Sequence, residues 1–140
     1  LAIGERTAED IKIKVGSAVP LKDELDVEVN GRDVITGLPT TVRIESEEIR
    51  RALNKPLDEM AKAVKDALDA TPPDLASDLM YYGILLTGGG ALLRGLDVRL
   101  RDETGVSVNV SPTALDNVVN GCARVLEANA FDGGFVQTNA

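Results

Sequence analysis

The chain has 140 residues, of which 15 are basic, 23 are acidic and none is histidine, so its formal net charge is −8. This acidic balance argues against nucleic-acid binding and against a polybasic membrane anchor, because both need clustered positive charge. The lack of histidine excludes Ser-His and Cys-His triads and any imidazole metal site. With 44% hydrophobic but only 3% aromatic residues, the chain can bury a core made mainly of aliphatic side chains.

The single Cys122 cannot form an intramolecular disulfide, so the cysteine count does not indicate secretion. No apolar run approaches the roughly 20 residues that a membrane-spanning helix needs, and no signal peptide opens the chain. The first residue is Leu1 rather than Met. Together these features predict a cytoplasmic part of a larger protein.

A short helix is predicted over residues 7–16, with Thr7 as its N-cap and Gly16 just beyond its last turn. Glu9 and Lys12 lie three residues apart on it and therefore share one face. On that face they could hydrogen-bond a ribose hydroxyl and a base edge. From the spacing alone, a solvated ion pair is the favoured interpretation.

Alternation of apolar and polar residues then predicts strands. A first strand starts at Leu25 and ends in a hairpin turn at Asn30-Gly31, and two more follow over 33–36 and 41–45. We therefore expect a small α+β outer lobe over residues 1–45, made of one helix and a three-stranded meander.

A long amphipathic helix is predicted from Ser46, its N-cap, to the stop at Thr71-Pro72-Pro73. Pro56 inside this segment is expected to kink or split the helix. One or two further turns follow over 74–80. The apolar residues recur at spacings of three and four and form one stripe, which consists of Ile49, Leu53, Leu57, Met60, Val64 and Leu68.

The remaining chain alternates between strand and helix patterns, over residues 84–87, 93–104, 106–110 and 115–126. Such a βαβα order favours a parallel strand pair with a right-handed crossover. Cys122 lies on the apolar stripe of the last helix, so we expect a core residue rather than a nucleophile. We place an α/β lobe over 46–130, with the boundary near Glu45, and a frayed tail over 131–140.

The most informative segment is the buried strand 84–87 followed at once by Gly88-Gly89-Gly90. Ligands of open α/β sheets bind beyond the carboxyl ends of strands, where this turn lies. Three glycines let a flat ligand approach the backbone, and the backbone amides could bind an anion. The segment is neither a G-x-G-x-x-G fingerprint nor a P-loop, and a tight turn without a ligand explains the glycines equally well.

Four segments in this order closely resemble the MreB family of bacterial actin-like proteins, which shape rod cells. They are I-G-E-R-T-A-E-D-I-K-I-K-V-G-S-A, G-R-D-V-I-T-G-L-P-T-T-V, P-P-D-L-A-S-D-L and I-L-L-T-G-G-G-A-L-L-R-G-L-D. The resemblance runs from about residue 1 to residue 127. It implies an α/β fold of the actin and heat-shock ATPase type, of which this chain is the second half. That half has a ribonuclease H-like βαβα lobe, which closes over the nucleotide, and the small α+β outer lobe.

The resemblance also implies that the E-x-I-K segment and the G-G-G-A turn line the adenosine end of an ATP site. Asp10 stands where Arg or Glu is common in the family. The family's phosphate loops, magnesium-binding acids and water-positioning residue belong upstream of Leu1, so neither catalytic nor metal-binding residues are assigned here. The nucleotide-binding residues carried over to this sequence are Glu9, Asp10, Ile11, Lys12, Gly88, Gly89, Gly90 and Ala91.

The function implied is that of the C-terminal half of an ATP-binding cytoskeletal protein that assembles with itself into filaments and guides cell-wall synthesis. Full-length members are slow ATPases, whereas this part alone is expected to be inactive because it lacks groups that stabilise charge at the γ-phosphate. We expect cytoplasmic filaments with membrane-protein partners of cell shape and wall synthesis, and membrane contact through residues outside this chain. The alternatives are an actin-fold chaperone, a sugar-kinase-like ATPase fragment and a stand-alone binding module.

Overall fold

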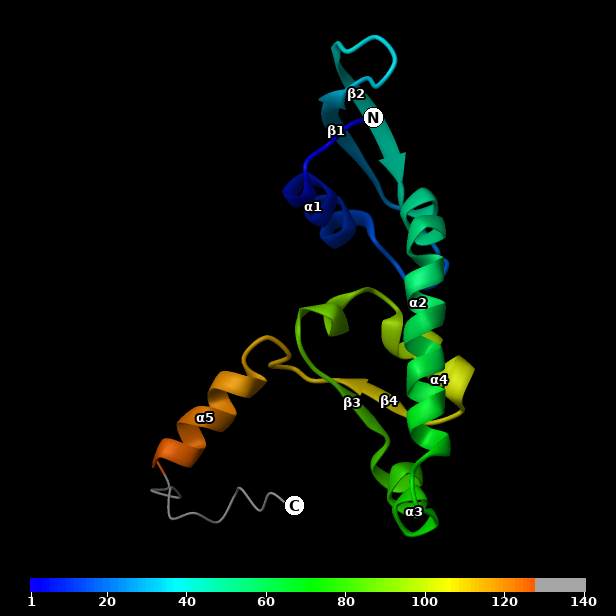
Figure 1. Ribbon diagram of the computed structural model, residues 1–140, viewed down its shortest axis with the longest axis vertical. Coiled ribbons are helices and arrows are strands. Elements are labelled where there is room, and N and C mark those ends of the chain that lie inside the picture. The colour runs from blue at the N-terminus through cyan, green and yellow to red at the C-terminus, as the bar shows by residue number, and fades with distance from the viewer. Residues whose placement is uncertain (128–140) are drawn as a thin grey trace.

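The computed structural model describes residues 1–127 and shows an elongated arrangement with a strand pair at one end and a short helix at the other (Figure 1). The predicted tail over 131–140 lies outside the described residues. The elements in chain order are α1 (Glu5–Val15), β1 (Asp26–Arg32), β2 (Pro39–Glu45), α2 (Ser46–Asp69), α3 (Pro73–Tyr82), β3 (Ile84–Leu86), the 3₁₀ helix η1 (Gly89–Leu92), α4 (Leu96–Thr104), β4 (Val108–Val110) and α5 (Asn117–Glu127).

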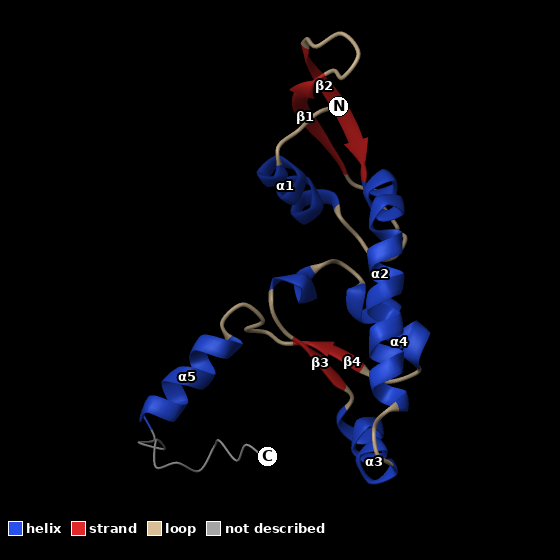
Figure 2. Ribbon diagram, viewed as in Figure 1, coloured by secondary structure: helices blue, strands red, loops and turns tan. Residues whose placement is uncertain are grey.

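The outer lobe consists of α1 and the antiparallel pair β1–β2 (Figure 2). The predicted first helix is present, but it begins at Glu5, and its N-cap is Gly4, three residues before the expected N-cap Thr7. Its buried face carries Ile11 and Val15, which pack with Val29 of β1 into a small core. Half-buried apolar residues complete that core, namely Val27, Ile44 and Ile49.

The predicted three-stranded meander is wrong, because the described outer lobe has two long strands. The Asn30-Gly31 pair does not turn; it continues β1 and pairs with β2. The chain reverses over 33–38 instead, where the backbone N–H groups of Thr36 (2.8 Å) and Ile35 (2.7 Å) donate hydrogen bonds to Asp33 Oδ1. These bonds lower the pKa of the Asp33 carboxyl. The side-chain cap stabilises the longer loop, and the longer strands form more ladder hydrogen bonds.

Helix α2 is one continuous element of 24 residues that runs beside both lobes (Figure 2). It begins at Ser46 as predicted, but its N-cap is Glu45, which forms a reciprocal capping box with Glu48. Pro56 does not split the helix. Pro56 is exposed, so the carbonyl group that loses its helical partner lies on the side that water can reach.

The second lobe, which we call the closing lobe, contains β3, α4 and β4. Strands β3 and β4 pair in parallel, with Ile84 opposite Val108, as the βαβα order predicted. Helix α4 begins three residues later than expected, because its N-cap Gly95 has a left-handed backbone with a φ of 72°. Residues 89–92 form η1. The buried core of this lobe consists of Ala18, Leu57, Ala61, Leu96, Leu100 and Val108. Since Ile49 of α2 packs on the outer lobe and Leu57 on this one, α2 joins the two cores, and the boundary near Glu45 stays a prediction.

Helix α5 matches the last predicted helix, but none of its residues is buried. Val118 is 77% exposed and Leu126 is 63% exposed. Cys122 is exposed as well, so the prediction that it is a core residue is wrong. The apolar stripe is present in the sequence, yet neither described core extends to it.

Candidate functional site

Helix α1 turns the E-x-I-K segment partly to solvent and partly to the core. Glu9, Asp10 and Lys12 are exposed, whereas Ile11 is 5% exposed and belongs to the outer-lobe core. Within residues 1–127, neither Glu9 nor Lys12 takes part in an ion pair. The solvated pair that the spacing favoured is therefore not formed, and both side chains are available to a ligand. Ile11 anchors this face of α1 through packing.

The glycine turn follows β3 directly and is open on its outer side. Gly88 has a φ of 82°, a conformation that residues with a Cβ rarely adopt. A Cβ at Gly90 would meet no atom within 4 Å, and one at Gly89 would meet only Leu115 Cδ2, at 3.6 Å. Ala91 is 5% exposed and points inward. The backbone conformation therefore favours glycine at 88, and the packing leaves free space in front of 89 and 90.

A polar network holds the turn in place. The Gly88 N–H donates to the Ala114 carbonyl (2.8 Å), and Thr87 Oγ1 donates to the same oxygen (3.1 Å). Asn117 Nδ2 in turn donates to Thr87 Oγ1 (2.9 Å). The sequence interpretation missed Thr87 and Asn117, because a strand-end threonine and a helix-start asparagine have ordinary structural uses. Their contacts fix the direction in which the turn leaves the sheet.

Arg94 connects the glycine turn with α1. Its Nη1 donates hydrogen bonds to the carbonyl oxygens of Ile13 (3.0 Å) and Gly16 (3.3 Å), at the C-terminal end of α1. Its own carbonyl accepts a bond from the Ala18 N–H (2.8 Å). Both predicted ligand-binding segments are thus held on the same side of α2 (Figure 1). No sequence pattern predicts this contact of Arg94, since an arginine beside a turn is usually a solvent-exposed residue.

A second polar cluster anchors the segment between α1 and β1 to the first turn of α2. Arg50 Nη2 donates to Glu24 Oε1 (2.8 Å), and the wholly buried Ser46 donates to the other carboxylate oxygen. The Arg50 and Ser46 hydrogen bonds lower the pKa of Glu24 to about 2. Ser46 Oγ also accepts a bond from the Leu25 N–H (3.0 Å). The cluster holds β1 against the start of α2.

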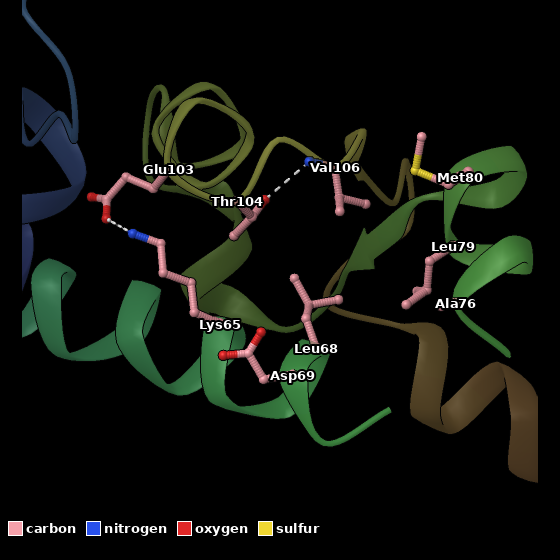
Figure 3. A pocket seen from close by; sticks show the side chains of 9 residues that line it. All are labelled: Lys65, Leu68, Asp69, Ala76, Leu79, Met80, Glu103, Thr104 and Val106. Carbon is pink, nitrogen blue, oxygen red and sulfur yellow. Dashed lines mark hydrogen bonds and ion pairs between the residues drawn. The ribbon is translucent and has the colours of Figure 1, made fainter. Parts of the chain in front are cut away.

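A separate cavity of about 370 Å³ lies at the opposite end of the molecule from the β1–β2 pair (Figure 1). Residues of α2, α3 and α4 line it (Figure 3). Lys65 Nζ donates to Glu103 Oε2 (3.0 Å) at its edge, and this bond lowers the pKa of Glu103. None of the predicted nucleotide-binding residues lines the cavity. Its apolar lining comes from Leu68, Ala76, Leu79, Met80 and Val106.

The part of the chain that the structure describes contains no group of three or more His, Cys, Asp or Glu side chains arranged to bind a metal ion. Over the same residues, no helix has both the length and the apolar character that crossing a membrane requires.

Comparison with known proteins establishes the family. A family model described as "MreB/Mbl protein" matches residues 1–132. The chain belongs to the MreB/Mbl family. The cell shape-determining protein Mbl of Bacillus cereus is 45% identical over 127 residues, which are 91% of this chain and 38% of that protein. The cell shape-determining protein MreB of Escherichia coli is 46% identical over 132 residues, 94% of this chain and 38% of that protein.

Solved MreB structures share the fold. The structure of MreB5 of Spiroplasma citri bound to ADP superposes with a TM-score of 0.87 at 36% identity, and covers 95% of this chain and 41% of that one. The same protein bound to AMPPNP gives a TM-score of 0.87 at 36% identity, over 93% and 39% of the two chains. These matches confirm the predicted α/β actin-like fold. The chain spans 38% of the length of these two curated relatives.

Proposed function

We propose that this chain supplies the adenosine side of the ATP site in a cell shape-determining, actin-like protein. Two structural neighbours are proteins bound to ADP and AMPPNP, which supports a nucleotide as the ligand. The observation that carries the proposal is the glycine turn. Gly90 has no neighbour within 4 Å, so a flat ligand has room to lie against the backbone there.

Apart from Asp10 and Gly88, each predicted residue has a distinct part in this proposal. The exposed Glu9 carboxylate accepts a hydrogen bond from a ribose hydroxyl, and Lys12 donates to the edge of the base. Gly89 and Gly90 let the adenosine lie against the backbone. Ile11 holds α1 by packing in the core, and Ala91 is buried beside the turn.

The phosphates and magnesium are proposed to lie against other residues of a full-length protein. Magnesium prefers carboxylate and phosphate oxygens, and residues 1–127 offer no acidic cluster that could bind it. The part proposed for this chain is therefore to bind the nucleotide. We expect ATP turnover to require those other residues.

Self-association into filaments is the second part of the proposal, and exposed apolar residues at two places support it. These places, the β1–β2 loop and α3, lie at opposite ends of the molecule (Figure 1). The loop between β1 and β2 exposes Val34 (72%) and Ile35 (91%), and α3 at the opposite end exposes Met80 (76%) and Tyr81 (87%). A head-to-tail contact would bury both surfaces, and repeated head-to-tail contacts that do not close produce filaments. Sedimentation of a full-length protein with and without ATP tests this: ATP-dependent pelleting supports it, and protein that stays in the supernatant contradicts it.

Such filaments are proposed to lie in the cytoplasm along the membrane. There they would guide membrane proteins of cell shape and wall synthesis, with membrane contact made by residues outside this chain. The family assignment favours this reading over a chaperone or a sugar kinase.

The nucleotide proposal is tested by Gly90→Val in a full-length protein that carries this chain. The new methyl groups would occupy the adenosine position, so we expect affinity for a fluorescent ATP analogue to fall by about tenfold or more. The melting temperature should change little, since a Cβ at 90 meets nothing within 4 Å.

The matched control is Gly121→Val, because Gly121 is also exposed and free of neighbours within 4 Å but lies on α5, away from the turn. This variant should bind the analogue normally. Unchanged affinity in Gly90→Val would show that the turn has only a structural role.

A further inference from the structure

The two segments of the proposed nucleotide site belong to different lobes, and one side chain connects them. Arg94 follows the glycine turn in the closing lobe, while Glu9 and Lys12 lie on α1 of the outer lobe. The hydrogen bonds from Arg94 Nη1 to Ile13 (3.0 Å) and Gly16 (3.3 Å) span more than 75 residues of sequence. Lys12 directly precedes Ile13, so the contact is made one residue away from the proposed ligand face.

The position of this contact is chemically favourable. The last carbonyl groups of a helix have no intrahelical donor, and the C-terminal end of a helix attracts positive charge. The Lys12 carbonyl receives the Gly16 N–H (2.8 Å) as its cap. The Ile13 carbonyl lies in the last turn of α1, and the guanidinium of Arg94 supplies its donor. Arg94 thus completes the end of α1 from another lobe.

The guanidinium can be removed without removing the rest of this junction. The Arg94 carbonyl binds the Ala18 N–H through the backbone, and both Ser17 (0%) and Ala18 (4%) are buried. Gly95 has a φ of 72°, and a Cβ there would lie 2.4 Å from Val19 Cγ2, so the backbones pack closely. These contacts need no side chain from Arg94. The role of the guanidinium is therefore limited to α1.

We propose that Arg94 is a positioning residue for the nucleotide, whose guanidinium sets the separation between the Glu9–Lys12 face and the Gly88–Gly90 turn. This inference rests on the proposed function. A ligand held from both sides binds best when the two sides are already at the correct distance. Without the guanidinium, the end of α1 loses two hydrogen bonds from the closing lobe, while the backbone contacts of Ser17 and Ala18 remain. Ordering α1 then costs free energy at the moment of binding.

The test uses Arg94→Ala, Arg94→Lys and Arg94→Gln in a full-length protein that carries this chain, titrated with a fluorescent ATP analogue. We expect Arg94→Ala to lower affinity by about 5- to 20-fold, and Arg94→Lys to recover part of the loss because one ammonium can still reach a carbonyl. Arg94→Gln keeps a single neutral donor and should fall between the two. The control is Arg101→Ala on α4, which removes an exposed arginine whose nearest carboxylate is Asp97 at 3.7 Å and should not change affinity.

A positioning role also predicts coupling with Glu9. Glu9→Gln should cost less affinity in the Arg94→Ala background than in the unchanged protein, because the misplaced carboxylate no longer meets its partner. A merely structural role would lower the melting temperature and leave the two substitutions independent. Full additivity, or unchanged affinity in all three Arg94 variants, would overturn the inference.

The two proposals fail differently. If Gly90→Val abolishes binding and the Arg94 variants do not weaken it, the nucleotide site stands and the role of Arg94 is wrong. If neither position affects binding, both the proposed site and the positioning role are wrong.

Discussion

Helices α2 and α5 have the same kind of sequence and opposite surroundings. Both carry a clear apolar stripe, yet Leu57 and Ala61 of α2 are 1% and 0% exposed, while no residue of α5 is buried. The difference comes from what precedes each helix. Helix α2 follows β2 directly and lies beside both lobes, whereas α5 leaves a loop tied to the glycine turn and points away from them (Figure 2). An apolar stripe shows which face of a helix can be buried, but it does not show which other element packs against that face.

The largest effect on stability is expected from truncating a buried side chain of α2. Leu57→Ala should lower the free energy of unfolding by about 2–5 kcal/mol, because it removes buried methyl groups and leaves a cavity in the closing-lobe core. Urea unfolding of the 140-residue chain measures this. Met60→Ala on the same helix is the control, since Met60 is 45% exposed and should cost much less. Equal losses for the two variants would mean that α2 is not packed as described.

A smaller loss of stability is expected at low pH, through the contacts of Glu24 with the first turn of α2. The pKa of Glu24 is lowered from 4.5 to about 2 by Arg50 and Ser46, so the folded state favours its ionised form. The resulting stabilisation is fully present above about pH 4.5 and is lost as the pH falls towards 2. Thermal unfolding should therefore show a stability loss across this window that Glu24→Gln makes shallower.

The control for this pH experiment is Glu28→Gln, which removes one charge from an exposed strand position without touching Arg50. Its stability should follow the pH as the unchanged chain does. A Glu24→Gln profile with the original slope would contradict the proposed anchoring of β1 to α2.

The smallest effect is expected on α5. Val118→Ser should change the free energy of unfolding by less than about 0.5 kcal/mol, because Val118 is 77% exposed and the two residues have similar helix propensities. The same urea experiment on the 140-residue chain measures it. A loss above about 1 kcal/mol would show that the stripe of α5 is covered in solution, and would remove the contrast with α2.

Much of the fold was predictable because local patterns and tertiary contacts agree. Residues 46–69 form the long helix, and the β3–β4 pair is parallel, as periodicity and element order indicated. The three-stranded meander was wrong because Asn30-Gly31, a favourable hairpin turn, pairs along β1 instead. The seven residue pairs between β1 and β2, together with the loop hydrogen bonds to Asp33, outweigh the turn preference of Asn30-Gly31. A short sequence segment does not contain both strands, so it cannot show which arrangement is more stable.

The candidate site shows the same division. The glycine turn and the Glu9–Lys12 face were visible as residue types at regular spacing, and the family resemblance assigned a ligand to them. Arg94 was not visible, because its partners Ile13 and Gly16 lie far away in the sequence. Hydrogen bonds between such distant groups depend on how the lobes dock.

By itself, then, the sequence determined the helices and strands with strong periodicity, the MreB/Mbl membership and the two segments offered to a ligand. Only the tertiary structure decided that Ile11 and Ala91 turn inward, that α2 joins two cores, that the stripe of α5 stays exposed, and that Arg94 links the lobes. The physical reason is the sequence separation over which each kind of interaction acts. Periodicity and caps act within a few residues, while burial and interlobe hydrogen bonds depend on groups that only the folded chain brings together.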